Sequence, residues 1–562
     1  MFLLLSGLMS MGQTTKIEVA KFETLDGKRA RNNARYEIFK SKSNLEEFYV
    51  VETARESYGI STYSTKTMER LSGYNVEEPS DGNREPQWIK YLFHEGNLTM
   101  VYAIFNKKLD TYTVYGKIVD DAGQSVTDET VLMEIEARKK KDVGGIVLRL
   151  SEDETQLLLL REPPGGRFER EKLELALFDR DLNKQYEDAF SFPYKYKSLY
   201  LEDIKISNLG EIIIVCNWEQ DVREVRKSRS SKTKAASTKV TKIFSVNVDE
   251  EDLREIELEQ KGYSFTDMNG YVLNEPNIMV FTGFYREMTR NASRRDQFKG
   301  ANGIYYIVLD LSTMELVTRN YDTFSDEQLA EIFAASVKKK KANKIADKGF
   351  GLSSYYIRNM FYTEDGKVAM VLEKSYVVEH CNTNQNGQTT CTYTYYDMEL
   401  LEVHVDEDGK IFRTRVIPKK QISRSSSGGS GNYTGLSIGF GRGAKVYWHG
   451  SIVLENEGKL FYVFNDAEKN FSNKRVKPGQ VKGFGYPYST NRNGFGPGKK
   501  RLAVAYYSNE EDELAKDPLT SSFKTNISIH PKSACRISND VVITWCDPVK
   551  GKGLSLVKIY LD

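Results

Sequence analysis

Two short motifs in this chain have the spacing of known chemical sites. The segment 435–439, with the sequence GLSIG, matches the G-x-S-x-G turn that presents a nucleophilic serine in α/β hydrolases. That turn needs a strand before it and a helix after it, whereas this segment lies in a Ser- and Gly-rich insertion that starts at Ser423. Asp179, Asp181 and Asn183 have the D-x-D-x-N spacing of a calcium loop, but the glycine and the closing glutamate of that loop are missing. We therefore predict neither a catalytic serine nor a calcium site.

Cys381 and Cys391 have the spacing of a cross-strand pair. They flank Asn386-Gly387, a dipeptide typical of a tight hairpin turn, so a hairpin centred there places the two sulfurs opposite each other. We predict a disulfide between them. A metal site made from His380 and the two cysteines is the alternative, but no second Cys/His pair stands nearby to complete it. We expect no metal, no other cofactor and no catalytic residues.

The chain has five cysteines in all. Cys535 and Cys546 flank the polar segment 538–540, and we predict a second disulfide there, with a turn centre that is ambiguous by one residue. Cys216 lies in an apolar run and is expected to be a buried thiol. Disulfides indicate an oxidising compartment.

These motifs lie within a pattern that recurs along the chain. Each unit has a short strand, a polar turn, a strongly apolar strand, a third strand that alternates with period two, and a fourth strand. The polar turns are 41–44, 94–97, 151–154, 207–210, 273–276, 363–366, 455–458 and 538–540. Units of this kind pack only on their neighbours, so they allow 562 residues to escape the size limit of one ordinary core.

Eight such units predict an all-β fold, a β-propeller of about eight four-stranded blades. The last unit ends after its third strand, 554–560, whereas segment 16–22 alternates correctly and precedes the first unit. We predict that this N-terminal strand supplies the missing outer strand, because it would close the fold and cover an exposed sheet edge. Seven blades are the alternative.

Residues 1–12 have features of an export signal. Phe2 to Leu8 is a short apolar stretch, and Ser10 and Gly12 place small residues at the two positions that determine cleavage. No Lys or Arg precedes the stretch, and a buried first strand is the alternative. No later stretch has the roughly 18 apolar residues of a transmembrane helix. We predict a signal peptide over 1–12 and a single propeller domain over 13–562, located in the periplasm, on the outer surface or in the medium.

One helix is expected between two units. Ser325 and Gln328 form a capping box, and Leu329, Ile332 and Phe333 make an apolar face. We predict that this helix ends in the lysine run 338–341, because positive charge suits a helix C-terminus.

Long insertions fall in two loop classes, between second and third strands and between consecutive units. They are 223–242, 286–299, 338–348, 423–443 and 466–500, and all except 423–443 carry a large excess of Lys and Arg. In antiparallel blades these two classes emerge at the same face. The binding residues that we predict are Arg226, Lys227, Arg229, Arg294, Arg295, Lys338, Lys339, Lys340, Lys341, Tyr486 and Tyr488. The tyrosines could stack on sugars or pack on a partner.

The net charge of +1 requires that acidic residues elsewhere balance this basic face. The leading hypothesis is a non-enzymatic binding or scaffold protein whose partner is an acidic polysaccharide, lipopolysaccharide or an acidic protein surface. An enzyme that acts on glycans or peptides from a central channel is the second hypothesis. Basic loops that are only solvated are the third. Export disfavours nucleic acid as a partner.

Several segments of the C-terminal half resemble a family of exported, uncharacterised Bacteroidetes proteins. They are the helix region 325–351, GLSSYYIR at 351–358, IPKKQ at 417–421 and FND at 464–466. The resemblance implies export and implies no activity.

Overall fold

The structure is a computed structural model of the chain. It describes residues 15–22, 35–41, 44–54, 57–76, 86, 88–94, 97–120, 122–151, 153–166, 169–208, 210–220, 238–248, 252–258, 263–273, 277–287, 300–334, 339–346, 351–362, 367–385, 389–426, 449–456, 459–467, 470, 484–485, 500–507, 514–518, 528–546 and 554–561. Within these ranges no helix is long and apolar enough to cross a membrane.

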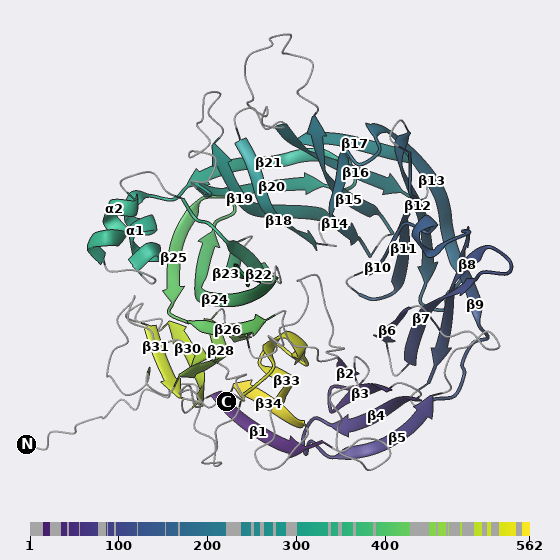
Figure 1. Cartoon of the computed structure of the whole chain (residues 1–562), viewed down its shortest axis with the longest axis horizontal. Helices are drawn as coiled ribbons and strands as arrows, with labels where there is room; N and C mark the ends of the chain where they lie inside the picture. Colours follow the sequence, from purple (N-terminus) through teal and green to yellow (C-terminus); the bar gives the residue numbers. More distant parts are fainter. Residues whose placement is uncertain are drawn as a thin grey trace, which may run out of the picture. The chain divides into compact units, whose positions relative to one another are not determined.

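The described strands form eight sheets, which are the blades of a β-propeller (Figure 1). Blade 1 contains β2 (Arg35–Lys40), β3 (Glu47–Ala54), β4 (Ser57–Ser64) and β5 (Arg70–Val76), and blade 2 contains β6 (Trp88–His94), β7 (Asn97–Asn106), β8 (Thr111–Val119) and β9 (Thr130–Glu136). Blade 3 contains β10 (Gly145–Leu150), β11 (Gln156–Glu162), β12 (Arg170–Asp179) and β13 (Lys184–Lys195), and blade 4 contains β14 (Leu199–Ile206), β15 (Ile212–Gln220), β16 (Thr238–Asn247) and β17 (Asp252–Leu258).

Blades 5 to 8 continue the same order. Blade 5 contains β18 (Tyr263–Leu273), β19 (Ile278–Glu287), β20 (Gly303–Asp310) and β21 (Glu315–Thr323). Blade 6 contains β22 (Tyr355–Tyr362), β23 (Val368–Thr383), β24 (Thr389–Val405) and β25 (Ile411–Ile417), together with β26 (Gln421–Ser426) and β29 (Phe484–Gly485). Blade 7 contains β27 (Ile452–Asn456), β28 (Lys459–Ala467), β30 (Lys500–Tyr507) and β31 (Leu514–Pro518), and blade 8 contains β32 (Cys535–Arg536), β33 (Val541–Cys546), β34 (Ser555–Leu561) and β1 (Thr15–Lys21). Each predicted polar turn joins the first two strands of a blade, and the described sheets number eight, not seven.

Strand β12 shows why the alternating sequences form blades. Leu173, Leu175 and Leu177 are buried in an apolar cluster that includes blade 4, whereas Ala176 and Phe178 are buried in a second cluster that includes blade 2. Successive side chains of a strand point to opposite faces, so alternation buries both faces of the sheet against neighbouring blades.

The N-terminal strand completes the last blade, as predicted. β1 pairs antiparallel with β34 along its whole length, from Thr15 opposite Leu561 to Lys21 opposite Ser555, and the purple and yellow strands lie side by side in Figure 1. Ile17 packs against the apolar core of blades 7 and 8. β34 therefore has a partner on each side and does not present an open edge.

The chain divides into two compact units. Unit 1 holds blades 1, 7 and 8 and the segment Ser375–Glu399, and unit 2 holds blades 2 to 5 and the rest of the β22–β25 sheet. In unit 2, shared apolar clusters join blade 2 to 3, 3 to 4, 4 to 5 and 5 to 6. In unit 1, such clusters join blade 7 to 8 and blade 8 to 1.

Strands β23 and β24 form a hairpin and, with 16 and 17 residues, are the longest strands in the part of the chain that the structure describes. The part of this hairpin in unit 1, Ser375–Glu399, is called the arm below. In the arm, β24 pairs with β26 over Thr392–Asp397, and β26 pairs in parallel with the short β29. β25 pairs with β24 outside this path, so the outer-strand position beside β24 is shared by two strands.

Two helices, α1 (Asp326–Ala334) and α2 (Lys339–Ala346), separate β21 from β22 (Figure 1). The predicted capping box is present: Ser325 N donates to Gln328 Oε1 at 2.8 Å, and Gln328 N donates to Ser325 Oγ at 3.2 Å. Leu329 and Ile332 are buried, as predicted. The prediction that the lysine run ends this helix is wrong, because Lys339 begins a second helix. Lys339, Lys340 and Lys341 thus lie at a helix N-terminus, where the positive end of the helix dipole opposes their charge.

Candidate functional site

The long insertions lie between the strands where the sequence analysis placed them. In unit 2, residues 221–237 follow β15, residues 288–299 follow β19, and the helical segment follows β21. In unit 1, residues 427–448 follow β26 and residues 486–499 precede β30. Second-to-third-strand and blade-to-blade connections leave an antiparallel sheet at the same end, called the loop-bearing end below.

Three basic segments therefore leave two consecutive blades of unit 2 at the loop-bearing end, one from blade 4 and two from blade 5. Among the predicted binding residues in them, Lys340 and Lys341 are exposed on α2, and Lys339 begins that helix. The predicted residues that lie outside the described ranges are Arg226, Lys227, Arg229, Arg294, Arg295 and Lys338 in unit 2 and Tyr486 and Tyr488 in unit 1.

Lys242 closes the first basic segment but is engaged inside the protein. Its side chain is buried, and its Nζ lies 2.8 Å from Glu255 Oε1 and 2.5 Å from Glu257 Oε2. Nζ also lies 5.5 Å from the ring centres of Tyr194 and Trp218. Burial alone would lower the pKa of Lys242, but the hydrogen bonds to the two glutamates outweigh it and raise the pKa. This lysine anchors the base of the segment and is not available to a partner.

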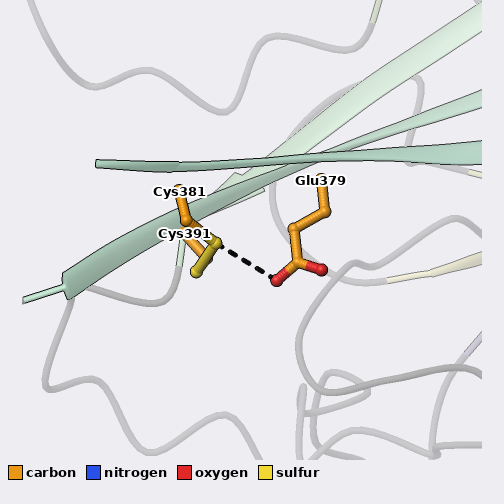
Figure 2. A group of neighbouring side chains, drawn as sticks. All are labelled: Glu379, Cys381 and Cys391. Atoms are coloured by element: carbon orange, nitrogen blue, oxygen red, sulfur yellow. Dashed lines mark hydrogen bonds between the residues drawn. A yellow bond between two sulfur atoms is a disulfide. The ribbon is translucent and has the colours of Figure 1, made fainter. Parts of the chain in front are cut away.

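The predicted disulfide between Cys381 and Cys391 is present near the tip of the arm (Figure 2). The Cα atoms are 4.0 Å apart, and ten positions separate the two residues. The contact between Ser375 and Asp397 and the stacked rings of Tyr376 and Tyr396 continue the same cross-strand register.

Glu379 lies beside this disulfide, with Oε1 3.3 Å from Cys381 Sγ (Figure 2). The three side chains are close enough to surround one ion. Sulfurs that are bonded to each other are not thiolates and are poor ligands, so the oxidised arm does not form the alternative metal site.

The second predicted disulfide is wrong. Cys535 and Cys546 are both described, and the structure forms no bond between them. Cys535 lies opposite Ile543, which is three residues before Cys546 on β33, and Cys546 lies opposite Ser555. Three strand residues span about 10 Å, which exceeds the Cα separation that a disulfide tolerates. Cys216 is a buried thiol, as predicted, and burial raises its pKa.

A buried polar cluster at the base of the arm, which the sequence analysis missed, brings together an acid and a histidine. Asp397 on β24 accepts a hydrogen bond from Ser375 and a second from His449 Nδ1, at 3.0 Å. His449 has no exposed surface, and among the described groups its Nε2 has no hydrogen-bond partner. A histidine oriented through Nδ1 by a carboxylate presents Nε2 as a base or a hydrogen-bond acceptor.

Charge stabilises the ionised form of Asp397. Burial alone would raise the pKa of this carboxyl, but the hydrogen bond from His449 and the positive charge of Lys419 outweigh burial and lower the pKa well below its usual range. Lys419 is itself buried, and its Nζ donates to Gln421 Oε1 at 3.1 Å.

Two buried amides connect this cluster to blades 7 and 8. Gln421 accepts a hydrogen bond from Gly450 N at 2.8 Å and donates to the carbonyl oxygen of Asn465 at 3.0 Å. The Asn465 side chain in turn accepts from Ile529 N and donates to the carbonyl oxygen of Ile529. The Gln421 and Asn465 side chains thus bond to backbone groups of neighbouring segments and hold the segment that carries His449 in place.

Asp179 does not begin a calcium loop. Its Oδ1 accepts hydrogen bonds from the backbone N–H groups of Asp181 and Asn183, and its Oδ2 accepts from the side-chain amides of Asn183 and Gln185. The carboxylate therefore stabilises the β12–β13 turn.

No protein-family model and no curated protein sequence matches the chain. A solved structure of a protein of unknown function from Bacteroides caccae is 10% identical, with a TM-score of 0.25, over 68% of this chain and 94% of that chain. The WD40 domain of SCAP from fission yeast is 9% identical, with a TM-score of 0.33, over 98% of this chain and 99% of that chain. Prolyl oligopeptidase B from Galerina marginata is 8% identical, with a TM-score of 0.36, over 92% of this chain and 56% of that chain. At these scores the likenesses carry no argument about function.

Proposed function

We propose that this protein is an exported, non-enzymatic binding or scaffold propeller that engages an anionic partner at the loop-bearing end of unit 2. The observation that carries the proposal is that three basic segments follow β15 in blade 4 and β19 and β21 in blade 5, which are consecutive blades. Acidic polysaccharide, lipopolysaccharide and acidic protein surfaces all fit this chemistry.

The position of the lysines on α2 supports the proposal. Lys340 and Lys341 are exposed in the first turn of α2, and that turn contains no acidic residue. Positive charge near a helix N-terminus is unfavourable, so a bound anion would relieve the repulsion among the lysines and between the lysines and the helix dipole. A bound anion would bring no such gain at Lys242, because two glutamates already neutralise its charge.

A pair of lysine variants tests where the partner binds. Lys340→Gln/Lys341→Gln should weaken the binding of heparin by roughly fivefold to thirtyfold at low salt, because each lysine near an anionic surface contributes on the order of 1 kcal/mol or less. The measurement is isothermal titration with a heparin fragment, together with a thermal melt that checks folding.

The matched control is Lys184→Gln/Lys410→Gln. These two lysines lie in unit 2 beside third-to-fourth-strand turns, at the end of the sheets opposite the loop-bearing end, with side chains 42% and 65% exposed. Heparin binding should remain within about twofold of the unmodified protein, because the net charge changes equally but the binding end is untouched. Equal losses in both double variants would contradict the proposed location.

Export, a signal peptide over 1–12, one propeller domain over 13–562 and membership of the Bacteroidetes family are parts of the same proposal. The disulfide of the arm supports export, because such bonds persist in oxidising compartments. Oxidation of Cys381 and Cys391 in protein isolated under thiol-blocking conditions, read by mass spectrometry, is the direct test.

A further inference from the structure

The redox state of the arm decides whether its tip carries the donors of a metal site. Glu379, Cys381 and Cys391 offer one carboxylate oxygen and two sulfurs, and these atoms all lie within 4.8 Å of one another (Figure 2). In the disulfide the two sulfurs are bonded to each other. Reduction turns both into thiols, and thiolates are strong ligands for zinc.

The strand pairing of the hairpin holds these three side chains on one face of the arm. The disulfide joins Cys381 to Cys391 across the two strands, and Glu379 precedes Cys381 by two residues, so it points to the same face. His380, which belongs to the alternative metal site of the sequence analysis, lies between Glu379 and Cys381 and points to the opposite face. A carboxylate, and not the histidine, is therefore the third donor beside the two sulfurs.

The tip of the arm is accessible to a reductant and to an ion. Cys381 and Glu379 are exposed, and Cys391 is half-buried. Exposed disulfides are among those that are most readily reduced. Glu379 Oε1 lies 3.3 Å from Cys381 Sγ, so after reduction this carboxylate can accept a hydrogen bond from the thiol. It is then in position to bind an ion that replaces the thiol proton.

We propose that the reduced arm binds a zinc ion through Cys381, Cys391 and Glu379, with a water molecule as the fourth ligand. A dithiol reductant breaks the Sγ–Sγ bond: it transfers two electrons and two protons to the cysteines and becomes a disulfide itself. The zinc ion then displaces both thiol protons to solvent, so that the two sulfurs bind as thiolates. Two thiolates, a carboxylate and a water complete the four-coordinate tetrahedral shell that zinc prefers.

The disulfide and the zinc ion are then alternative links across the same hairpin. The disulfide joins positions that are ten residues apart in the chain, and zinc links the same two strands where a dithiol has reduced the arm. Because zinc binds the ordered hairpin, it should restore order that reduction removes. The site lies in unit 1 and uses none of the lysines of unit 2, so the proposal does not depend on the anionic partner.

A zinc titration of the full chain tests the site. The protein is reduced with dithiothreitol, the reductant is removed under nitrogen, and zinc is titrated in competition with a chromogenic chelator. The reduced protein should take up one more zinc ion than the oxidised protein, with a dissociation constant of about 1 µM or tighter. Cys216, Cys535 and Cys546 are thiols in both forms, so the oxidised protein is the blank for them.

Variants assign the ligands. Cys381→Ser/Cys391→Ser should lose the redox-dependent uptake, and Glu379→Gln should bind zinc about tenfold or more weakly, because an amide carries no charge and is a poorer zinc ligand than a carboxylate. Glu407→Gln is the matched control, because Glu407 is an exposed glutamate of the β24–β25 turn in unit 2. Its zinc affinity should stay within about twofold of the unmodified protein. A thermal melt of each oxidised variant checks folding.

Hydrogen exchange gives a second readout. Zinc should lower the exchange of residues 375–399 in the reduced protein and leave their exchange in the oxidised protein unchanged. Equal zinc uptake by the reduced and the oxidised protein, or an unchanged zinc affinity in Glu379→Gln, would overturn the proposal.

Discussion

Among single residues, the buried polar groups decide which charges a partner could reach. Lys242 and Lys340 both belong to segments that are basic in sequence, yet Lys242 contacts two glutamates and two aromatic rings, whereas Lys340 is exposed. Sequence reasoning could not separate them, because Glu255 and Glu257 reach Lys242 across the β16–β17 pair. Sequence reasoning likewise could not predict the contact between Asp397 and His449, because the two residues are 52 positions apart and meet only in the folded chain.

Asp397→Asn tests the cluster at the base of the arm. The variant should lower the free energy of unfolding by about 3 kcal/mol at pH 7, because it removes a buried carboxylate that accepts two hydrogen bonds and faces a buried lysine. The folded-state pKa of Asp397 is lowered, so its contribution is present above the unfolded pKa of about 3.9 and is lost as the pH falls below that value towards the folded pKa. Urea unfolding at pH 7 and pH 3 measures the difference.

Asp408→Asn is the control for this prediction, because the Asp408 side chain is 75% exposed. It should leave the free energy of unfolding nearly unchanged at both pH values. A difference between Asp397→Asn and the unmodified protein that is as large at pH 3 as at pH 7 would show that the carboxylate charge is not the stabilising feature.

At the level of strands and turns, the turn residues predicted correctly which cysteines lie opposite each other only where they defined the centre of the turn. Asn386-Gly387 placed Cys381 and Cys391 correctly, whereas the less definite turn at 538–540 led to a wrong pairing of Cys535 with Cys546. The lysine run misled in another way, since four lysines suit a helix C-terminus but the chain begins a second helix there. Local charge is a weak preference that the packing of α2 against α1 can override.

The disulfide should matter mainly to the arm. Cys381→Ser/Cys391→Ser should raise hydrogen exchange and protease cleavage in 375–399, because loss of a disulfide that closes a short loop should reduce the stability of the ordered arm by about 2–3 kcal/mol. Blades 2 to 5, in unit 2, should exchange as before. Reducing agent should have the same effect on the unmodified protein and no effect on the variant. Unchanged exchange in the arm after reduction would contradict this role.

For the whole molecule, the sequence was sufficient for the architecture because every blade repeats the same local pattern. The eight polar turns, the alternating third strands and the N-terminal strand that pairs with β34 were all predictable from period and turn chemistry. The long β23–β24 hairpin and the shared outer-strand position of β25 and β26 were not, because they depend on contacts between distant segments.

The proposed function rests on charge, so its salt dependence is the most direct test. The affinity for heparin should fall about 50-fold or more between about 50 and 200 mM salt, because several lysines and arginines would release counterions from the polymer on binding. The measurement is the slope of log affinity against log salt concentration for the full chain. An affinity that is equal at both salt concentrations would contradict an anionic partner held by the basic segments of unit 2.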